Sequence, residues 1–191
     1  MKLHYRGRYN LDPESLPHGT HQPGAIPFKE AKDTKEMGII ANVLALVIMV
    51  PLLGLLYLRS GAVFLSLQFT LGVSASLLIL LPHELLHAVC FKEDVYIYTN
   101  LKHGMLFVIG PEIMSKSRFI FLSMLPNLVF GFIPYAIAII NPSLIFLGAF
   151  GAMSISMGAG DYYNVFHAIT QMPKGAKTYL YQFNSFWYLP S

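Results

Sequence analysis

The sequence carries little charge for its length. Of its 191 residues, 12% are charged, against roughly a quarter in an ordinary soluble domain. Hydrophobic residues make up 54% of the chain. This balance is typical of a membrane protein and argues against an ordinary soluble domain.

Cysteine and net charge are scarce as well. Cys90 is the only cysteine, which excludes an intramolecular disulfide. A formal net charge of +3 is too small to suggest nucleic-acid binding, so we expect no nucleic-acid partner. Residues 1–36 hold no apolar run and therefore do not form a cleaved signal peptide. We interpret them as a polar cytoplasmic segment.

Long apolar runs, in contrast, are plentiful. A membrane-spanning helix needs about 20 mostly apolar residues, and four segments of the chain meet this requirement. They are 37–58, 62–90, 119–140 and 144–170. We therefore predict an all-α membrane protein with four transmembrane helices in a domain at 37–170, followed by a cytoplasmic tail at 171–191.

Basic residues predict the orientation of these helices. Twelve of them lie in the N-terminal segment, the middle loop and the tail, whereas Arg59 alone lies in the two short turns. Because basic residues accumulate on the cytoplasmic side, we expect both termini and the loop at 93–118 to be cytoplasmic. The protein is expected to be integral to a membrane, with the lipid bilayer as a partner.

The middle loop contains two short runs that favour strands. "VYIYT" and "MLFVI" are rich in β-branched and aromatic residues, and the polar stretch "NLKHG" separates them. We predict a small cytoplasmic β-hairpin or sheet between the second and third spans. An irregular loop at the membrane surface is the alternative.

A His-Glu-Leu-Leu-His motif ends the second apolar run. Residues four apart share a helix face, so His83 and His87 can present two imidazoles to one metal ion. Glu84 is placed to act on a water molecule as general base. Ionisable groups inside a membrane segment are costly and usually mark function. The alternative is that the histidines serve only as hydrogen-bonding groups in the bundle.

Two histidines leave a catalytic zinc site one protein ligand short. Asp161 is the only acidic residue in the fourth run, and its expected depth is similar to that of His83. The weaker rivals lie in the loop, beyond the motif or elsewhere on the fourth run. They are His103, Glu93, Asp94, Glu112, Cys90 and His167.

Two asparagines are polar groups within the predicted spans. Asn127 and Asn164 could each hydrogen-bond a substrate carbonyl, and an ordinary hydrogen bond between helices explains either residue equally well. We consider both as candidates for substrate positioning.

These motifs resemble those of a known group. "HELLH" near the end of one span, a strand-rich loop and "GD" in a later span are similar to intramembrane metalloproteases of the site-2 protease type. The whole chain most closely resembles a family of small four-span bacterial membrane proteins, the "putative zincin peptidases". The resemblance implies one Zn²⁺ held by His83, His87 and Asp161, with Glu84 as general base. It also implies a location in the bacterial plasma membrane.

The function that we expect is zinc-dependent hydrolysis of a peptide bond in a membrane protein or peptide, within the membrane or at its surface. The alternative is a non-catalytic metal-binding membrane protein, such as a sensor or an assembly factor. Glu84 distinguishes the two, because a purely structural site does not need it. A transporter fits poorly because the chain shows no inverted repeat.

Overall fold

The computed structural model describes residues 1–61, 64–181 and 184–190. The chain forms two compact units, each assembled from separate segments. Unit 1 comprises Met1–Met37, Glu84–Ser123 and Asn164–Ser191, and unit 2 comprises Gly38–His83 and Met124–Tyr163. The start of the second predicted span, at residue 62, lies outside the described residues.

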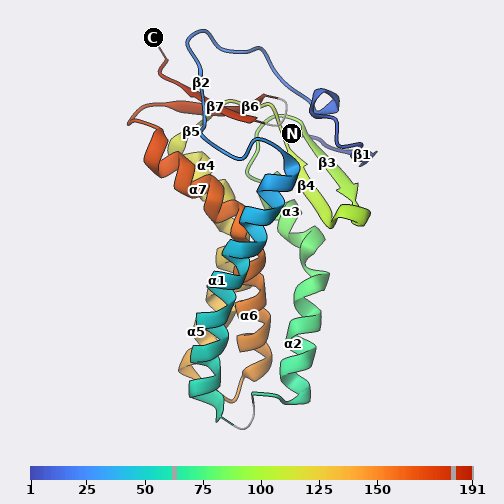
Figure 1. Ribbon diagram of the computed structural model, residues 1–191, viewed down its shortest axis with the longest axis vertical. Helices are drawn as coiled ribbons and strands as arrows, with labels where there is room; N and C mark the ends of the chain where they lie inside the picture. Colours follow the sequence, from blue (N-terminus) through green and yellow to red (C-terminus); the bar gives the residue numbers. More distant parts are fainter. Residues whose placement is uncertain (62–63, 182–183, 191) are drawn as a thin grey trace. The chain divides into compact units, whose positions relative to one another are not determined.

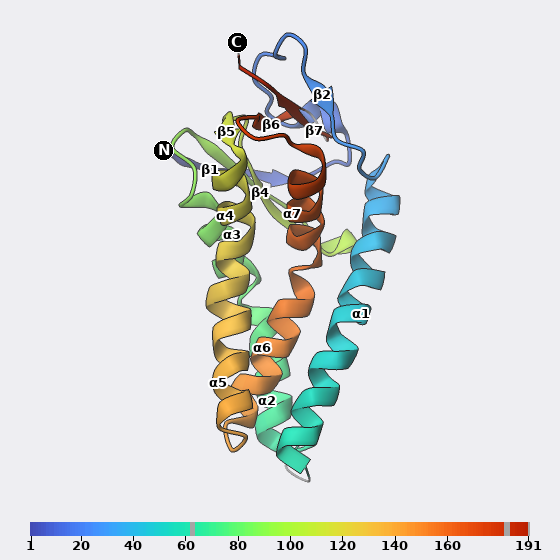
Figure 2. The ribbon, with the colours of Figure 1, turned by 90° about the vertical axis from the view of Figure 1, so that its left-hand side faces the viewer.

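Unit 2 is built of helices that run side by side in Figures 1 and 2. It contains most of α1 (Thr34–Ser60), then α2 (Leu67–Leu78), a π-helical segment η4 (Asn127–Phe132), α5 (Ile133–Ile140) and α6 (Ile145–Met157). The side chains packed at its centre are apolar and fully or almost fully buried. They are Leu56, Tyr135, Ala138, Ile145, Ala152 and Ile155.

Glycine allows two of these helices to approach closely. A Cβ atom on Gly72 of α2 would lie 2.4 Å from the carbonyl oxygen of Phe146 in α6. On the opposite side of α6, a Cβ on Gly151 would lie 2.6 Å from the backbone nitrogen of Tyr135 in α5. Small residues are the usual means by which apolar helices pack at short distance. Helix α6 is therefore held between α2 and α5.

Unit 1 contains the hairpin that the middle loop predicts. Strand β3 (Val95–Asn100) pairs antiparallel with β4 (Met105–Ile109), with Ile97 opposite Val108. Gly104 turns the chain between them at φ 64°, a backbone conformation that glycine adopts without strain. Strand β1 (Leu3–Arg8) lies parallel to β3, which gives the sheet the order β1-β3-β4 and leaves β4 at one edge.

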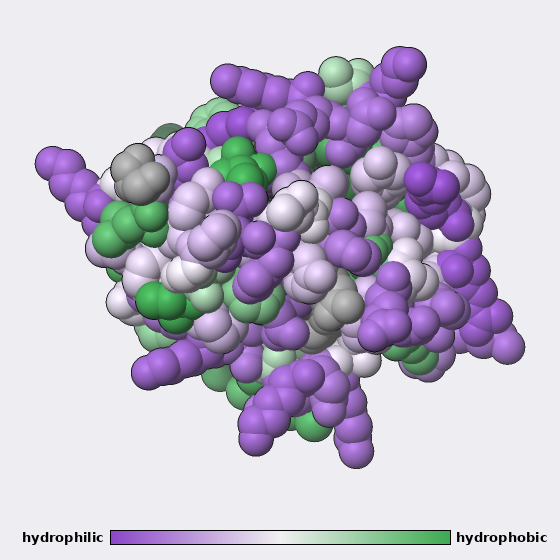
Figure 3. Space-filling model, turned by 90° about the horizontal axis from the view of Figure 1, so that it is seen from above, coloured by the Kyte–Doolittle hydropathy of each residue, from purple (hydrophilic) through white to green (hydrophobic). Residues whose placement is uncertain are grey.

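A second sheet in unit 1 joins the two ends of the chain. Its order is β2 (Ile26–Pro27), β7 (Asn184–Tyr188), β6 (Lys177–Tyr181) and β5 (Met114–Ser115), labelled in Figure 1. All neighbouring strands are antiparallel. The face of unit 1 that Figure 3 presents is largely hydrophilic, with small hydrophobic patches.

The prediction of an all-α protein with four transmembrane helices is therefore wrong. The described residues include seven strands in two sheets. Two of their helices are long and apolar enough to cross a membrane, Thr34–Ser60 and Lys116–Ile140. A third candidate exists if α2 and α3 (Leu80–Ala88), which meet at 44°, count as one broken span.

The fourth apolar run does not form one spanning helix, and the reason is local. It breaks at Gly158 into α6 and α7 (Ala159–Gln171), each of 13 residues, and neither piece has the length that a span requires. A polar side chain, Asn127, lies directly against Gly158. The prediction of a fourth span was based on the number of apolar residues in the run, which gives no sign of this break.

Candidate metal centre

Helix α3 carries the His-Glu-x-x-His motif. The potential ligand atoms of His83, Glu84 and His87 all lie within 4.8 Å of one another. Pro82 falls in the first turn of the helix, where a missing backbone N–H costs no helical hydrogen bond. The motif is therefore helical as predicted, and its three side chains form one cluster.

The orientation of His87 is set by a buried hydrogen bond. Its Nδ1 lies 2.9 Å from the carbonyl oxygen of Leu122 in α4 (Lys116–Pro126). A carbonyl only accepts, so Nδ1 carries the proton and Nε2 keeps its lone pair. Metal-binding histidines commonly have their second nitrogen held in this way.

Glu84 contacts the hairpin of unit 1. Its Oε2 accepts the backbone N–H of Val108 in β4 at 2.9 Å. Because β4 is an edge strand, this N–H is directed away from the neighbouring strand β3. The bond holds one carboxylate oxygen of Glu84, and no pattern in the sequence indicates it.

His83 and Asp161 face one another in unit 2. The Nε2 of His83 lies 3.1 Å from the Oδ2 of Asp161, and each side chain is 14% exposed. The amide of Asn127 donates to the same oxygen at 2.7 Å, and the hydroxyl of Tyr162 donates to Asn127 Oδ1 at 3.2 Å. Asp161 is thus part of a connected polar chain in a largely apolar unit.

The position of Asn127 depends on two backbone features. The π-helical segment η4 begins at Asn127, directly after Pro126, and such segments frequently occur at functional sites. A Cβ on Gly158 would lie 1.7 Å from Asn127 Oδ1, so only glycine leaves room for this side chain. The sequence signal was an asparagine after a proline within an apolar run, and it did not indicate the contact with Asp161.

The rival ligands make other contacts. His103 bonds Asn100, Asp94 bonds His4, and Glu112 bonds Arg118. His167 contacts Gln171, and burial lowers its pKa. Asn164 lies one turn beyond Asp161 in α7 and is partly buried.

The side chains of the motif, His83, Glu84 and His87, are of the kinds that bind zinc. Two imidazoles and one carboxylate are ligands of catalytic zinc sites. The tautomer of His87 keeps a lone pair on Nε2, the form in which a histidine binds a metal. Asp161 is not part of this cluster of three side chains, and Asn127 donates to it within unit 2. Glu84 adjoins His83 in the place that a general base occupies in such motifs.

Residues 76–177 match a family model described as "Putative zincin peptidase". The chain belongs to this family. The match covers more than half of the chain and includes all of α3 and Asp161. No curated protein and no solved structure matches the chain. Membership implies a zinc cofactor and metallopeptidase activity.

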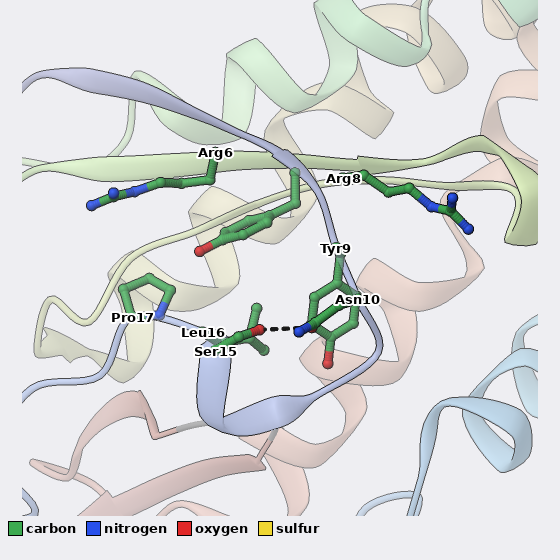
Figure 4. Close-up of a pocket in the computed structure, with 8 residues that line it drawn as sticks. Arg6, Arg8, Tyr9, Asn10, Ser15, Leu16 and Pro17 are labelled. Carbon is green, nitrogen blue, oxygen red and sulfur yellow. Dashed lines mark hydrogen bonds between the residues drawn. The ribbon is translucent and has the colours of Figure 1, made fainter.

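A separate hollow of about 390 Å³ opens in unit 1, beside β1 and β3 (Figure 4). Its wall is mostly polar, and Ser15 donates a hydrogen bond to Asn10 within it at 2.9 Å. The lining residues are Arg6, Arg8, Tyr9, Asn10, Ser15, Leu16, Pro17 and Tyr98. None of the residues predicted for the metal centre is among them.

Proposed function

We propose that this protein is a zinc-dependent peptidase with His83, His87 and Asp161 as its metal ligands and Glu84 as its general base. The observation that carries the proposal is the cluster formed by His83, Glu84 and His87 on α3, inside the region that matches the family. His83 also faces Asp161 at 3.1 Å, which supports the carboxylate as the third ligand.

The chemistry divides between the ion and the side chains. When bound, zinc in such a site activates water and polarises a carbonyl group. Glu84 takes the proton from the attacking water and delivers it to the leaving nitrogen of the peptide bond. The N–H of Val108 donates to Oε2 of the same carboxylate, which holds Glu84 in one orientation.

The substrate we propose is a membrane protein or peptide that binds in an extended form. Strand β4 has an open edge, and Val108 on that edge contacts Glu84. An added strand would therefore lie beside the general base. We propose that Asn127 orients Asp161, to which it donates a hydrogen bond, rather than the substrate. Asn164 stays a candidate for positioning the substrate.

The site of action that we propose is the bacterial plasma membrane, within the bilayer or at its surface. The two long apolar helices support membrane association. The distribution of basic residues supports cytoplasmic termini and a cytoplasmic loop at 93–118. A relation to site-2 proteases rests on the motifs alone and stays a prediction.

A non-catalytic metal-binding protein, such as a sensor or an assembly factor, is the second candidate. The bond between Glu84 and Val108 favours it in one respect, because this bond gives the glutamate a structural role without catalysis. The two candidates differ in what happens when the carboxylate is replaced and the metal is kept.

Glu84→Gln provides the test. The variant should retain zinc, since Glu84 is not a proposed ligand, and should lose turnover by roughly two orders of magnitude or more. New protein N-termini would be compared in cells expressing the wild type, Glu84→Gln or the exposed-site control Glu93→Gln. Cleavages shared by the wild type and the control but absent from Glu84→Gln support the peptidase. Identical sets of N-termini in all three would support the non-catalytic candidate.

A further inference from the structure

The turn that follows α3 is held by a buried carboxylate. Glu112, whose side chain is 4% exposed, lies between β4 and β5. Its Oε2 accepts the backbone N–H of Lys92 at 2.7 Å and that of Glu93 at 3.1 Å. Both amides belong to the segment directly after α3, so Glu112 anchors the chain where the motif helix ends.

Arg118 connects this carboxylate to the same turn. It lies in the first turn of α4, and its Nη1 donates to Glu112 Oε1. Its Nε and Nη2 donate to the carbonyl oxygen of Cys90 at 3.1 and 2.6 Å. Carbonyls near a helix C-terminus lack helical partners, and a cation there is favoured by the helix dipole. The guanidinium provides both the donors and the charge.

The contact between α4 and the motif histidine lies one turn away. Leu122, which accepts from His87 Nδ1, follows Arg118 by four residues. His87 precedes Cys90 by three residues. The two contacts therefore occupy adjacent turns of the same pair of helices. A shift of Arg118 relative to Cys90 would also shift the carbonyl that orients the imidazole.

The Glu112 carboxyl is buried, whereas the Arg118 side chain is 22% exposed. Burial by itself raises the pKa of the Glu112 carboxyl, but the hydrogen bonds from Arg118 and from the amides of Glu93 and Lys92 outweigh it and hold the pKa below its usual value. Buried ion pairs are often no better for stability than apolar residues of similar size. A role in fixing a position accounts for side-chain bonds that run from the pair to the backbone of Cys90, Lys92 and Glu93, in the turn that follows α3.

We infer that Glu112 and Arg118 are positioning residues that hold His87 in the orientation required for zinc. The inference rests on the proposed function, since it takes His87 as a ligand. Neither residue touches the metal in this account. Both act through the end of α3 and the Leu122 carbonyl.

The test compares zinc affinity with folding stability. Arg118→Lys keeps the charge but loses the forked donors, and Glu112→Gln removes the charge while retaining an amide oxygen. Asp94→Asn is the control, because Asp94 lies in the same loop but contacts Lys2 and His4. Zinc affinity would be measured by competition with a chelator on full-length, detergent-purified protein that is monodisperse by size exclusion.

Arg118→Lys and Glu112→Gln should weaken zinc binding by about 10–100-fold, the usual cost of losing a group that supports a ligand. The d–d absorption of bound Co²⁺ should also change, and Asp94→Asn should match the wild type in both measurements. Unchanged affinity and an unchanged Co²⁺ spectrum in folded variants would overturn the inference. Absence of zinc binding by the wild type would instead overturn the proposed function.

A measurement on the wild type covers the case in which the variants do not fold. Coupling between two sites is reciprocal, so zinc bound at His87 should slow hydrogen exchange of the Lys92 and Glu93 amides several-fold. The amide of Lys2, which donates to Asp94 rather than to Glu112, serves as the internal reference. Equal exchange of Lys92 and Glu93 with and without zinc, in a protein that binds zinc, would refute the positioning role.

Discussion

The two units hold the side chains around the candidate metal centre by different means. In unit 2, Gly158 leaves room for the Asn127 side chain, and Asn127 and His83 both contact the carboxylate of Asp161. In unit 1, Glu84, His87 and Glu112 are held by hydrogen bonds to backbone atoms of other segments. The site residues of unit 2 are therefore positioned by contacts with one another, whereas those of unit 1 are positioned by hydrogen bonds to the backbone.

The largest expected effect concerns the carboxylate of unit 2. Asp161→Ala should reduce zinc affinity by roughly a hundredfold or more, because loss of a ligand exceeds the 10–100-fold cost of losing a supporting group. Isothermal titration of zinc into the purified protein would measure it. His167→Ala, which changes a residue of the same helix, should bind zinc like the wild type. Equal affinities for Asp161→Ala and the wild type would remove Asp161 from the ligand set.

Gly158 offers a direct test of steric fit. An alanine Cβ would lie 1.7 Å from Asn127 Oδ1, so Gly158→Ala should lower the free energy of unfolding by about 1–3 kcal/mol. Gly160→Ala is the matched control, because nothing lies within 4 Å of its added Cβ, and alanine favours a helix. Thermal unfolding in detergent would measure both. Equal stability of the two variants would show that the close contact at Gly158 does not constrain Asn127.

These contacts also separate the features that the sequence predicts from those that it does not. The motif helix and the hairpin depend on residues close together in the chain, so spacing and strand propensity predict them. The pairing of β2 with β7 joins Ile26 to Trp187, and no local pattern encodes a partner so distant. The fit of Asn127 against Gly158 likewise joins residues that are 31 positions apart in the chain.

At the metal centre, too, the sequence predicts some of the contacts and not others. Helical spacing brings His83 and His87 together, and a lone acidic residue in an apolar run made Asp161 a candidate for the third ligand. The supporting contacts of Leu122 with His87 and of Val108 with Glu84 involve backbone atoms. The identity of the side chain says little about which backbone group will accept or donate, so these partners required the structure.

Val108 tests the role of the backbone in unit 1. Val108→Pro removes the N–H that Glu84 accepts, and proline is tolerated on an edge strand where that N–H does not serve the sheet. Turnover should fall several-fold while zinc affinity stays unchanged, because the base loses its orientation but the ligands do not. Val108→Ala, which keeps the N–H, is the control. Unaltered turnover in Val108→Pro would mean that the bond does not orient Glu84 for catalysis.

The smallest effect is a pH dependence from Glu112. Its pKa is lower in the folded protein, so its contribution to stability is present above the unfolded-state value of about 4.3. That contribution is lost as the pH falls through the lower folded-state value. Melting temperatures recorded from pH 6 to pH 3 should fall less steeply for Glu112→Gln than for the wild type. Parallel curves would argue against an ionised Glu112 in the folded state.

X-ray absorption at the zinc edge tests the central claim most directly. Full-length protein loaded with one equivalent of zinc should show two imidazole nitrogens at about 2.0–2.1 Å and carboxylate oxygen at about 2.0–2.2 Å. Glu84→Gln should give the same spectrum. A first shell with fewer than two imidazoles, or a shell that changes in Glu84→Gln, would contradict the assignment of His83 and His87 as ligands with Glu84 as the base.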